Sequence, residues 1–266
     1  MAHIRMKLYS NCLRRYTNVT ILIPTPTESD YPPEQLDTFD GPKFFQEQPS
    51  YRVLYLLHGT HGDDTDWSYY SNVERDIIGS NLMVVCPDGG NSFWTDMEDG
   101  QLQETFLTQE LREYINRLFP TLPERENTFL AGLSMGGFAT LNIAMKYPEI
   151  YGKVASFSAG IIPDDLDAIT TRTYPWRLFL SDDKKVEGSK VDGIMSMKTA
   201  LRQKVTLPEI YLTIGTDDYL YENVQRTRNV FDEHHVSYEY YECEGEHNFE
   251  FWSSQIGSVI KWMLNE

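Results

Sequence analysis

Short apolar runs alternate with helical segments from Tyr51 to the end of the chain. The expected strands are Arg52–Leu57, Leu82–Cys86, Thr128–Leu133, Val154–Ser158, Glu209–Ile214 and Tyr238–Cys243. The expected helices are Asn72–Gly79, Glu104–Phe119, Met135–Tyr147, Ile194–Gln203, Tyr221–His235 and Phe249–Leu264. Strands that are apolar throughout are buried on both faces, so this alternation predicts an α/β fold with a mostly parallel sheet and helices on both sides.

The first fifty residues follow a different pattern. Alternating polar and apolar residues at Ile4–Ser10 and Thr17–Ile23 predict two antiparallel strands at one edge of the sheet. Residues 24–50 are rich in proline and acidic residues, which indicates a long surface excursion. We find no internal repeat and no second composition regime, and 266 residues can bury one core. We therefore expect a single domain over residues 1–266.

The stretch FLAGLSMGGFAT, residues 129–140, places Ser134 between an expected strand and an expected helix. Three glycines, Gly132, Gly136 and Gly137, surround this serine. A sharp strand-to-helix turn pushes the turning side chain outward, and the neighbouring positions tolerate only small residues. In a parallel sheet, ligands bind at the carboxyl ends of the strands, where Ser134 falls. Ser134 is therefore the candidate nucleophile.

A serine nucleophile needs a histidine base and an acid that orients the histidine. In a sheet of this type the chain order is serine, acid, histidine. His247 follows the last expected strand and so lies at the correct edge, whereas His234 and His235 precede that strand. Asp217 and Asp218 both follow the strand before it, and position alone does not separate them.

The loop after the first parallel strand reads HGTHGDDTDW and is expected to stabilise an oxyanion. The backbone N–H groups of Thr60 and Met135 are the expected donors. We interpret His58 mainly as a loop-shaping residue whose ring bonds nearby backbone. Together with Phe93 and Trp94 it is also a candidate for lining the substrate pocket.

No metal or cofactor is expected. His58 and His61 lack a third histidine that would complete a zinc site. Asp63, Asp64 and Asp66 lack the full spacing of a calcium loop. We therefore expect chemistry that needs only protein groups.

Charge and cysteine content limit the partners and the compartment. The formal net charge of −17 disfavours nucleic acid and anionic lipid as partners. No apolar run reaches the roughly 18 residues of a membrane span, and the N-terminus has no apolar signal core. Three widely spaced cysteines favour a reducing compartment. We expect a cytoplasmic protein that binds a small-molecule ester, and homo-oligomerisation stays open.

Together these motifs resemble the α/β-hydrolase serine esterases, and more closely the tributyrin esterase group of the esterase D-like branch. The resemblance runs from about Tyr51 to Trp262 and is strongest in VLYLLHGTHGDDTDW, TFLAGLSMGGFATLNIAMKYPEIYGKVASFSAG, IGTDDYLYENV and EGEHNFEFW. It implies an α/β-hydrolase fold and Asp218 as the acid. Residues 161–205, where relatives carry a cap or lid, are polar and charged here, so the roof of the pocket does not carry over.

The resemblance implies a serine carboxylesterase that forms an acyl-serine on short-chain esters of the tributyrin, acetyl or feruloyl type. An acyltransferase and an S-formylglutathione hydrolase-like thioesterase are alternatives on the same fold. A non-catalytic binding protein is disfavoured, because every role of a Ser-His-Asp triad is filled.

Overall fold

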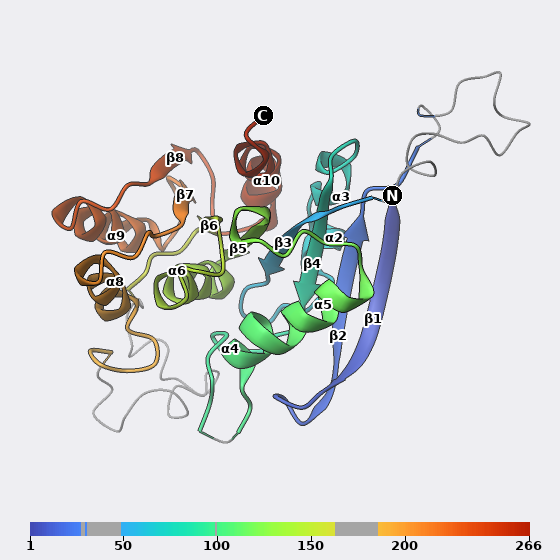
Figure 1. Ribbon diagram of the computed structural model, residues 1–266. Helices are drawn as coiled ribbons and strands as arrows, with labels where there is room; N and C mark the ends of the chain where they lie inside the picture. The colour runs from blue at the N-terminus through green and yellow to red at the C-terminus, as the bar shows by residue number, and fades with distance from the viewer. Residues whose placement is uncertain (28–29, 31–48, 99, 163–185) are drawn as a thin grey trace, which may run out of the picture.

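The computed structural model describes residues 1–27, 30, 49–98, 100–162 and 186–266. Within these residues eight strands form one sheet in the order β1-β2-β4-β3-β5-β6-β7-β8 (Figure 1). The strands are β1 Ala2–Ser10, β2 Arg15–Ile23, β3 Arg52–Leu57, β4 Leu82–Pro87, β5 Thr128–Leu133, β6 Lys153–Phe157, β7 Glu209–Gly215 and β8 Glu239–Cys243. Strand β1 pairs antiparallel with β2, β2 pairs antiparallel with β4, and the pairs from β4 to β8 are parallel. The mostly parallel sheet with an antiparallel N-terminal edge is confirmed.

The helices largely follow the expected segments. They are α2 Asp66–Tyr70, α3 Val73–Asp76, α4 Gln103–Thr105, a π-helical turn Phe106–Glu110, α5 Leu111–Leu118, a 3-10 turn Arg125–Asn127, α6 Met135–Lys146, α8 Gly193–Arg202, α9 Tyr221–Glu233 and α10 Phe249–Leu264. The expected helix Asn72–Gly79 is shorter than predicted, and α2 forms in a segment that we interpreted as a loop. There the Asp63 carboxylate accepts hydrogen bonds from the backbone and hydroxyl of Thr65, which orders the chain into a turn just before α2.

Both faces of the sheet are buried, as the continuous apolar strands predict. In β3, Val53, Tyr55 and Leu57 join the core on the side of α5 and α6, whereas Leu54 and Leu56 join the core on the side of α2, α3 and α10. Figure 1 shows α5 and α6 in front of the sheet and α2 and α3 behind it. Helices on both faces are therefore confirmed. The sheet is the middle layer, and the loops of the site extend from the ends of its strands.

Two segments singled out in the sequence lie mainly outside the described residues. These are the surface excursion 24–50, of which 28–29 and 31–48 are not described, and the insertion 161–205, of which 163–185 are not described. The described end of the insertion contains α8, whose Met197 is buried in the same core as Leu141 and Met145 of α6. This end of the insertion is part of the helical layer on the sheet.

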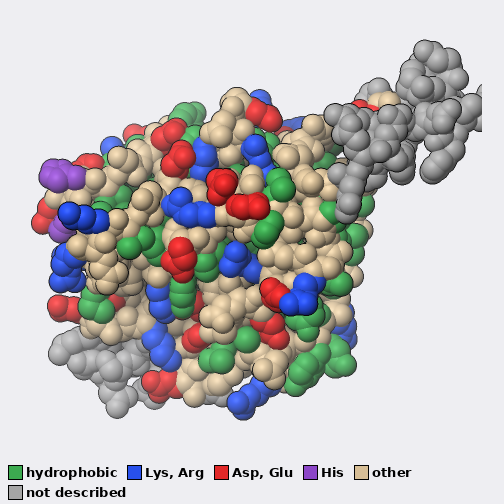
Figure 2. Space-filling model, viewed as in Figure 1, with side chains coloured by type: hydrophobic (Ala, Val, Ile, Leu, Met, Phe, Trp, Pro, Cys, Tyr) green, Lys and Arg blue, Asp and Glu red, His purple; other side chains and the backbone are tan. Residues whose placement is uncertain are grey.

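The surface carries interspersed charges of both signs on the face seen in Figure 2, with acidic and basic side chains close to one another. The net negative charge is thus not gathered into one acidic patch on that face. In the part of the chain that the structure describes, we find no helix with the length and apolarity that a bilayer crossing requires.

Candidate active site

The turn between β5 and α6 holds Ser134 in a strained conformation. Its backbone has φ 52° and ψ −119°, a positive φ that residues other than glycine rarely adopt. Its N–H donates to the carbonyl of Phe157 in β6 at 2.9 Å, and its carbonyl accepts from Phe138 N–H at 2.9 Å. Strand β6 and the first turn of α6 therefore hold the bend from both sides, and the partly exposed Ser134 side chain is presented at the carboxyl end of the sheet.

The glycines around Ser134 are required by close approach of backbone to backbone. A Cβ on Gly132 would lie 2.5 Å from the Gly136 carbonyl group. A Cβ on Gly136 would lie 2.6 Å from the carbonyl oxygen of His58, and one on Gly137 would lie 2.9 Å from the Gly132 carbonyl oxygen. Because these neighbours are backbone atoms, they cannot rotate away. The glycines thus let β5, α6 and the end of β3 meet at one point.

We expect Gly136→Ala to lower the free energy of unfolding by about 1–3 kcal/mol, since the new methyl group overlaps the end of β3. The matched control is Gly257→Ala in α10, where the nearest atom to the new methyl group is the Asp76 carboxylate oxygen at 2.9 Å, the end of a side chain. There a gain in helix propensity of up to about 1 kcal/mol offsets the contact. Urea unfolding of both variants measures the difference, and equal stability would contradict the steric account.

The side chains of Ser134, His247 and Asp218 form one hydrogen-bonded chain. Nε2 of His247 lies 2.9 Å from Oγ of Ser134. Nδ1 of His247 lies 3.0 Å from each carboxylate oxygen of Asp218. The Asp218 side chain is fully buried and that of His247 is 14% exposed, so the pair is largely removed from water. The loops after β5, β7 and β8 supply the three residues, which are far apart in sequence.

The structure separates the two aspartates that position alone left open. Asp218 faces His247, and one of its carboxylate oxygens also accepts from Leu220 N–H at 2.8 Å. Asp217 is exposed, and its carboxylate accepts a hydrogen bond from the neighbouring Thr216 hydroxyl. Only the Asp218 carboxylate can therefore orient the imidazole.

The start of α10 restrains the backbone of His247. Asn248 is the N-cap of that helix, and its side-chain oxygen accepts from Phe251 N–H at 3.1 Å. The histidine thus sits one residue before a capped helix, which limits the movement of its backbone.

The ring of His58 orients the peptide bond between Gly59 and Thr60. Its Nδ1 donates to the Gly59 carbonyl at 2.7 Å, and its Nε2 accepts from Gly89 N–H at 2.9 Å. In a trans peptide the C=O and N–H bonds point in opposite directions. Because the Gly59 carbonyl faces His58, the N–H of Thr60 points away from that ring. His58 is 1% exposed, so it shapes the loop and does not line an open pocket.

The segments that carry the two expected oxyanion donors lie next to Ser134. A Cβ on Gly59 would lie 3.3 Å from Cβ of Ser134, so the Gly59–Thr60 peptide runs beside the nucleophile. Met135 is the first residue of α6, where a backbone N–H has no acceptor within its own helix. The positive end of the α6 dipole lies at the same place and favours negative charge. This arrangement suits a transient oxyanion next to the Ser134 oxygen.

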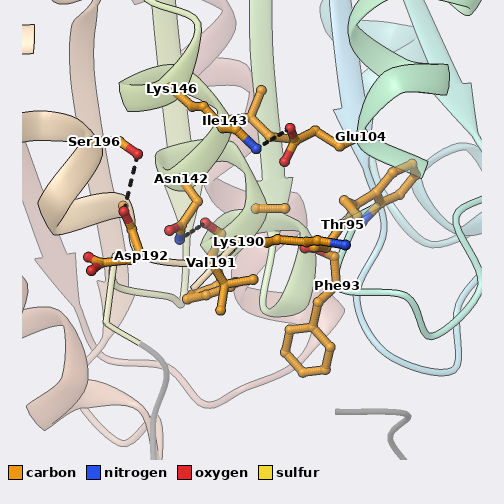
Figure 3. A pocket seen from close by; sticks show the side chains of 14 residues that line it. Phe93, Thr95, Glu104, Asn142, Ile143, Lys146, Lys190, Val191, Asp192 and Ser196 are labelled. Atoms are coloured by element: carbon orange, nitrogen blue, oxygen red, sulfur yellow. Dashed lines mark hydrogen bonds and ion pairs between the residues drawn. The ribbon is translucent and has the colours of Figure 1, made fainter. Parts of the chain in front are cut away.

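The loop after β4 holds Phe93 and Trp94 in different environments. Both have positive φ values, 52° and 56°, and Ser92 Oγ accepts from Trp94 N–H at 3.0 Å. Trp94 is 0% exposed and packs against the His58 ring, so it supports the oxyanion loop, and it also forms part of the wall of the small cavity beside α6. Phe93 is half-buried and packs edge-on against Phe138 of α6 at a centroid distance of 5.9 Å. Figure 3 shows the cavity beside α6 that Phe93 lines together with Asn142 and Val191.

The other histidines and the acidic loop have separate positions. His234 and His235 follow α9, before β8, at the opposite edge of the sheet. Asp64 is bound by the Arg5 guanidinium and the Thr20 hydroxyl, and burial raises the pKa of the Asp66 carboxyl above its ordinary value. Over residues 1–27, 30, 49–98, 100–162 and 186–266, no group of three or more His, Cys, Asp or Glu side chains is arranged to hold a metal ion.

Two aromatic residues beside His247 were not predicted from the sequence. The Tyr219 ring lies 4.4 Å from the imidazole, centroid to centroid, and the Trp252 ring meets it edge-on at 5.0 Å. The Trp252 indole N–H donates to Ser158 Oγ at 2.9 Å, which holds the ring in place. Tyr219 directly follows Asp218 and Trp252 lies on the first turns of α10, but only tertiary contact brings both rings to the histidine.

The doubly covered, mostly parallel sheet and the strand-to-helix turn at Ser134 define the class as the α/β-hydrolases. Residues 38–263 match the family model described as a putative esterase, and the chain belongs to that esterase family. Within the class, the chain is a serine carboxylic ester hydrolase.

Relatives cover almost the whole chain. An acetyl esterase of Caldicellulosiruptor saccharolyticus is 31% identical over 99% of this chain and 98% of its own length. Among solved structures, the fluorophosphonate-binding serine hydrolase F of Staphylococcus aureus superimposes with a TM-score of 0.87 at 23% identity, over 100% of this chain and 99% of that one. An S-formylglutathione hydrolase from the same species superimposes with a TM-score of 0.80 at 22% identity, over 98% of each chain. At these identities, the two structures support the fold.

Proposed function

We propose that the chain hydrolyses short-chain carboxylic esters through an acyl-serine intermediate on Ser134. The observation that carries this proposal is the hydrogen bond of 2.9 Å between Ser134 Oγ and His247 Nε2, with Asp218 on the opposite ring nitrogen. In this proposal Ser134 is the nucleophile, His247 the general base and acid, and Asp218 the orienting acid.

The acylation step uses the geometry as follows. His247 Nε2 takes the hydroxyl proton as Ser134 Oγ attacks the ester carbonyl carbon. The carbonyl oxygen becomes negatively charged and is stabilised by the N–H groups of Thr60 and Met135. The imidazolium then gives its proton to the leaving alkoxide oxygen, so the C–O bond breaks and a neutral alcohol departs. The buried Asp218 carboxylate stabilises the imidazolium throughout.

Deacylation repeats these steps with water. His247 removes a proton from the water molecule, whose oxygen attacks the acyl-serine carbonyl. The same two N–H groups hold the second oxyanion, and the proton returns to Ser134 Oγ as the carboxylic acid leaves. All proton transfers pass through one nitrogen, and no further group is required.

For the acyl group we propose a short chain, as in the tributyrin esterase group. The acetyl esterase that is 31% identical over nearly the full length supports this choice. Phe93 and Phe138, which pack against each other near the start of α6, are the residues that we assign to the acyl pocket. Tributyrin and feruloyl-type esters are the further candidates within this substrate class.

We expect activity toward p-nitrophenyl esters to be greatest for acetyl and butyryl groups and to fall about tenfold or more by dodecanoyl. The reason is that residues 161–205, where relatives carry a cap, are polar and charged, so no strongly apolar cap is expected to hold a long acyl chain. Measurement of kcat/KM across an acyl series from acetyl to dodecanoyl tests this prediction. A maximum at decanoyl or longer would refute the short-chain proposal. Formation of a new ester when an alcohol competes with water would favour the acyltransferase alternative, and faster cleavage of S-formylglutathione would favour the thioesterase.

We also propose a cytoplasmic location, a small-molecule ester as the partner, and no nucleic-acid or membrane partner. The three cysteines, Cys12, Cys86 and Cys243, are all described and all unpaired, which supports a reducing compartment. Burial raises the pKa of the Cys12 thiol to about 11, and the neighbouring Glu110 carboxylate adds to this rise. A measurement of molecular mass in solution would show whether the chain associates with itself.

A further inference from the structure

Tyr219 lies against the imidazole of His247 on the solvent side. Its ring is tilted by 44° at a centroid distance of 4.4 Å from the imidazole, and the residue is 73% exposed. It follows Asp218 directly, and Asp218 is held by its bonds to His247 and to Leu220 N–H. The exposed ring is thus anchored on the same short loop as the acid.

The second aromatic residue against the imidazole is buried. Trp252 is 6% exposed, meets the histidine ring edge-on at 5.0 Å, and is fixed through its indole N–H to Ser158 Oγ. An arriving substrate cannot displace this buried indole without breaking that hydrogen bond. Of the two described aromatic rings in contact with His247, Tyr219 is therefore the accessible one.

The chemistry of the proposed function places the alcohol part of the ester next to His247. The leaving oxygen must come within about 3 Å of His247 Nε2 to receive its proton. The acyl carbonyl oxygen meanwhile points toward the N–H groups of Thr60 and Met135, at the start of α6. The carbon atoms attached to the leaving oxygen thus lie within a few bonds of the imidazole, which is also where the Tyr219 ring lies.

We propose that Tyr219 is the residue that selects the alcohol part of the substrate, by packing its ring against an alcohol whose hydroxyl is carried on a six-membered ring. A flat aromatic ring offers apolar contact area to the C–H face of such a ring, whereas an open chain covers less of it. This inference rests on the proposed function and extends it from the acyl group to the leaving group. Cyclohexanol and a pyranose sugar share the required shape.

The competing explanation is that Tyr219 only positions His247 through ring contact. The two explanations differ in deacylation, because every acetate ester forms the same acetyl-Ser134 and the alcohol has already left. A contact with the alcohol affects acylation alone and depends on which alcohol is used. A positioning role affects both steps and all esters equally.

The experiment measures the hydrolysis of three esters: cyclohexyl acetate, n-hexyl acetate and a methyl pyranoside acetylated on one ring hydroxyl. Each ester is tested with the unmodified protein, Tyr219→Ala and Tyr219→Phe. For Tyr219→Ala we expect the kcat/KM ratio of cyclohexyl to n-hexyl acetate to fall about tenfold. Tyr219→Phe keeps the ring face and should keep the ratio. Single-turnover decay of the acetyl-enzyme should change less than about threefold in both variants. Tyr241→Ala removes a 45% exposed tyrosine of β8 and serves as the matched control.

Each outcome decides the proposal. An unchanged ratio in Tyr219→Ala overturns it, and so does a parallel loss for all three esters together with slower deacylation. If Tyr219→Ala lowers kcat/KM for cyclohexyl acetate but not for the acetylated pyranoside, the subsite binds apolar rings. If it lowers kcat/KM for both esters, the subsite also binds sugars. If the unmodified protein cleaves no ester, the proposed function has failed, and this result is distinct from a failure of the Tyr219 proposal.

Discussion

Replacing Ser134 with alanine is expected to lower kcat for ester hydrolysis by about 10⁴- to 10⁶-fold. The substitution removes the atom that forms the acyl intermediate, while His247 and the oxyanion donors remain in place. Residual turnover would come from binding and from the oxyanion donors, which act on a water molecule instead. Initial rates with p-nitrophenyl acetate measure the loss.

The matched control is Ser258→Ala, which removes an exposed hydroxyl from α10. We expect this variant to hydrolyse the ester at the rate of the unmodified protein. Circular dichroism of both variants checks that the fold is kept. Retention of more than about a tenth of the activity by a folded Ser134→Ala protein would contradict the assignment of the nucleophile.

Asp218→Asn is expected to lower kcat by about 10⁴-fold. Both carboxylate oxygens of Asp218 lie 3.0 Å from His247 Nδ1 and require that nitrogen to carry a proton. An asparagine amide that donates to Nδ1 favours the other tautomer, in which Nε2 carries the proton and cannot accept one from Ser134. The loss should therefore appear in kcat more than in KM.

Asp217→Asn is the control for this prediction, because it makes the same chemical change one residue away. Asp217 is exposed, and we expect this variant to keep most of its activity. Steady-state kinetics of the two variants, measured side by side, distinguish the aspartates. A large loss in Asp217→Asn with near-normal turnover in Asp218→Asn would reverse the assignment.

The strands and the order of the candidate triad could be predicted from the sequence because both depend on local pattern. The bounds of β3 and β5 agree with the expected Arg52–Leu57 and Thr128–Leu133, since continuous apolar runs end where the chain leaves the buried sheet. Ser134 and His247 could be found because they follow strands at the carboxyl edge of the sheet.

The residues whose surroundings the sequence did not reveal depend on tertiary packing. Trp94 lines the cavity beside α6 together with Phe93, but the contact of its fully buried indole with His58 depends on the fold and has no local signal. Tyr219 and Trp252 carry no motif, and their relation to His247 exists only once α10 and the loop after β7 have packed. Asp217 and Asp218 differ in burial, which two adjacent identical residues cannot reveal in a sequence.

Three of the rare backbone conformations lie near the site. Ser134, Phe93 and Trp94 all have positive φ values, and all lie on loops at the edge of the sheet that presents the site. Such conformations persist only where the surrounding structure holds them. Here the glycine contacts hold the Ser134 turn and the hydrogen bond to Ser92 holds the other loop.

The most direct measurement is covalent labelling of the folded protein with a fluorophosphonate, followed by peptide mass spectrometry. We predict one phosphonyl adduct per chain, located on the peptide that carries Ser134, and its absence in Ser134→Ala and strong slowing in His247→Ala. An unlabelled Ser134 in folded, ester-cleaving protein, or an adduct on another serine, would contradict the central claim that this hydroxyl is the one His247 activates.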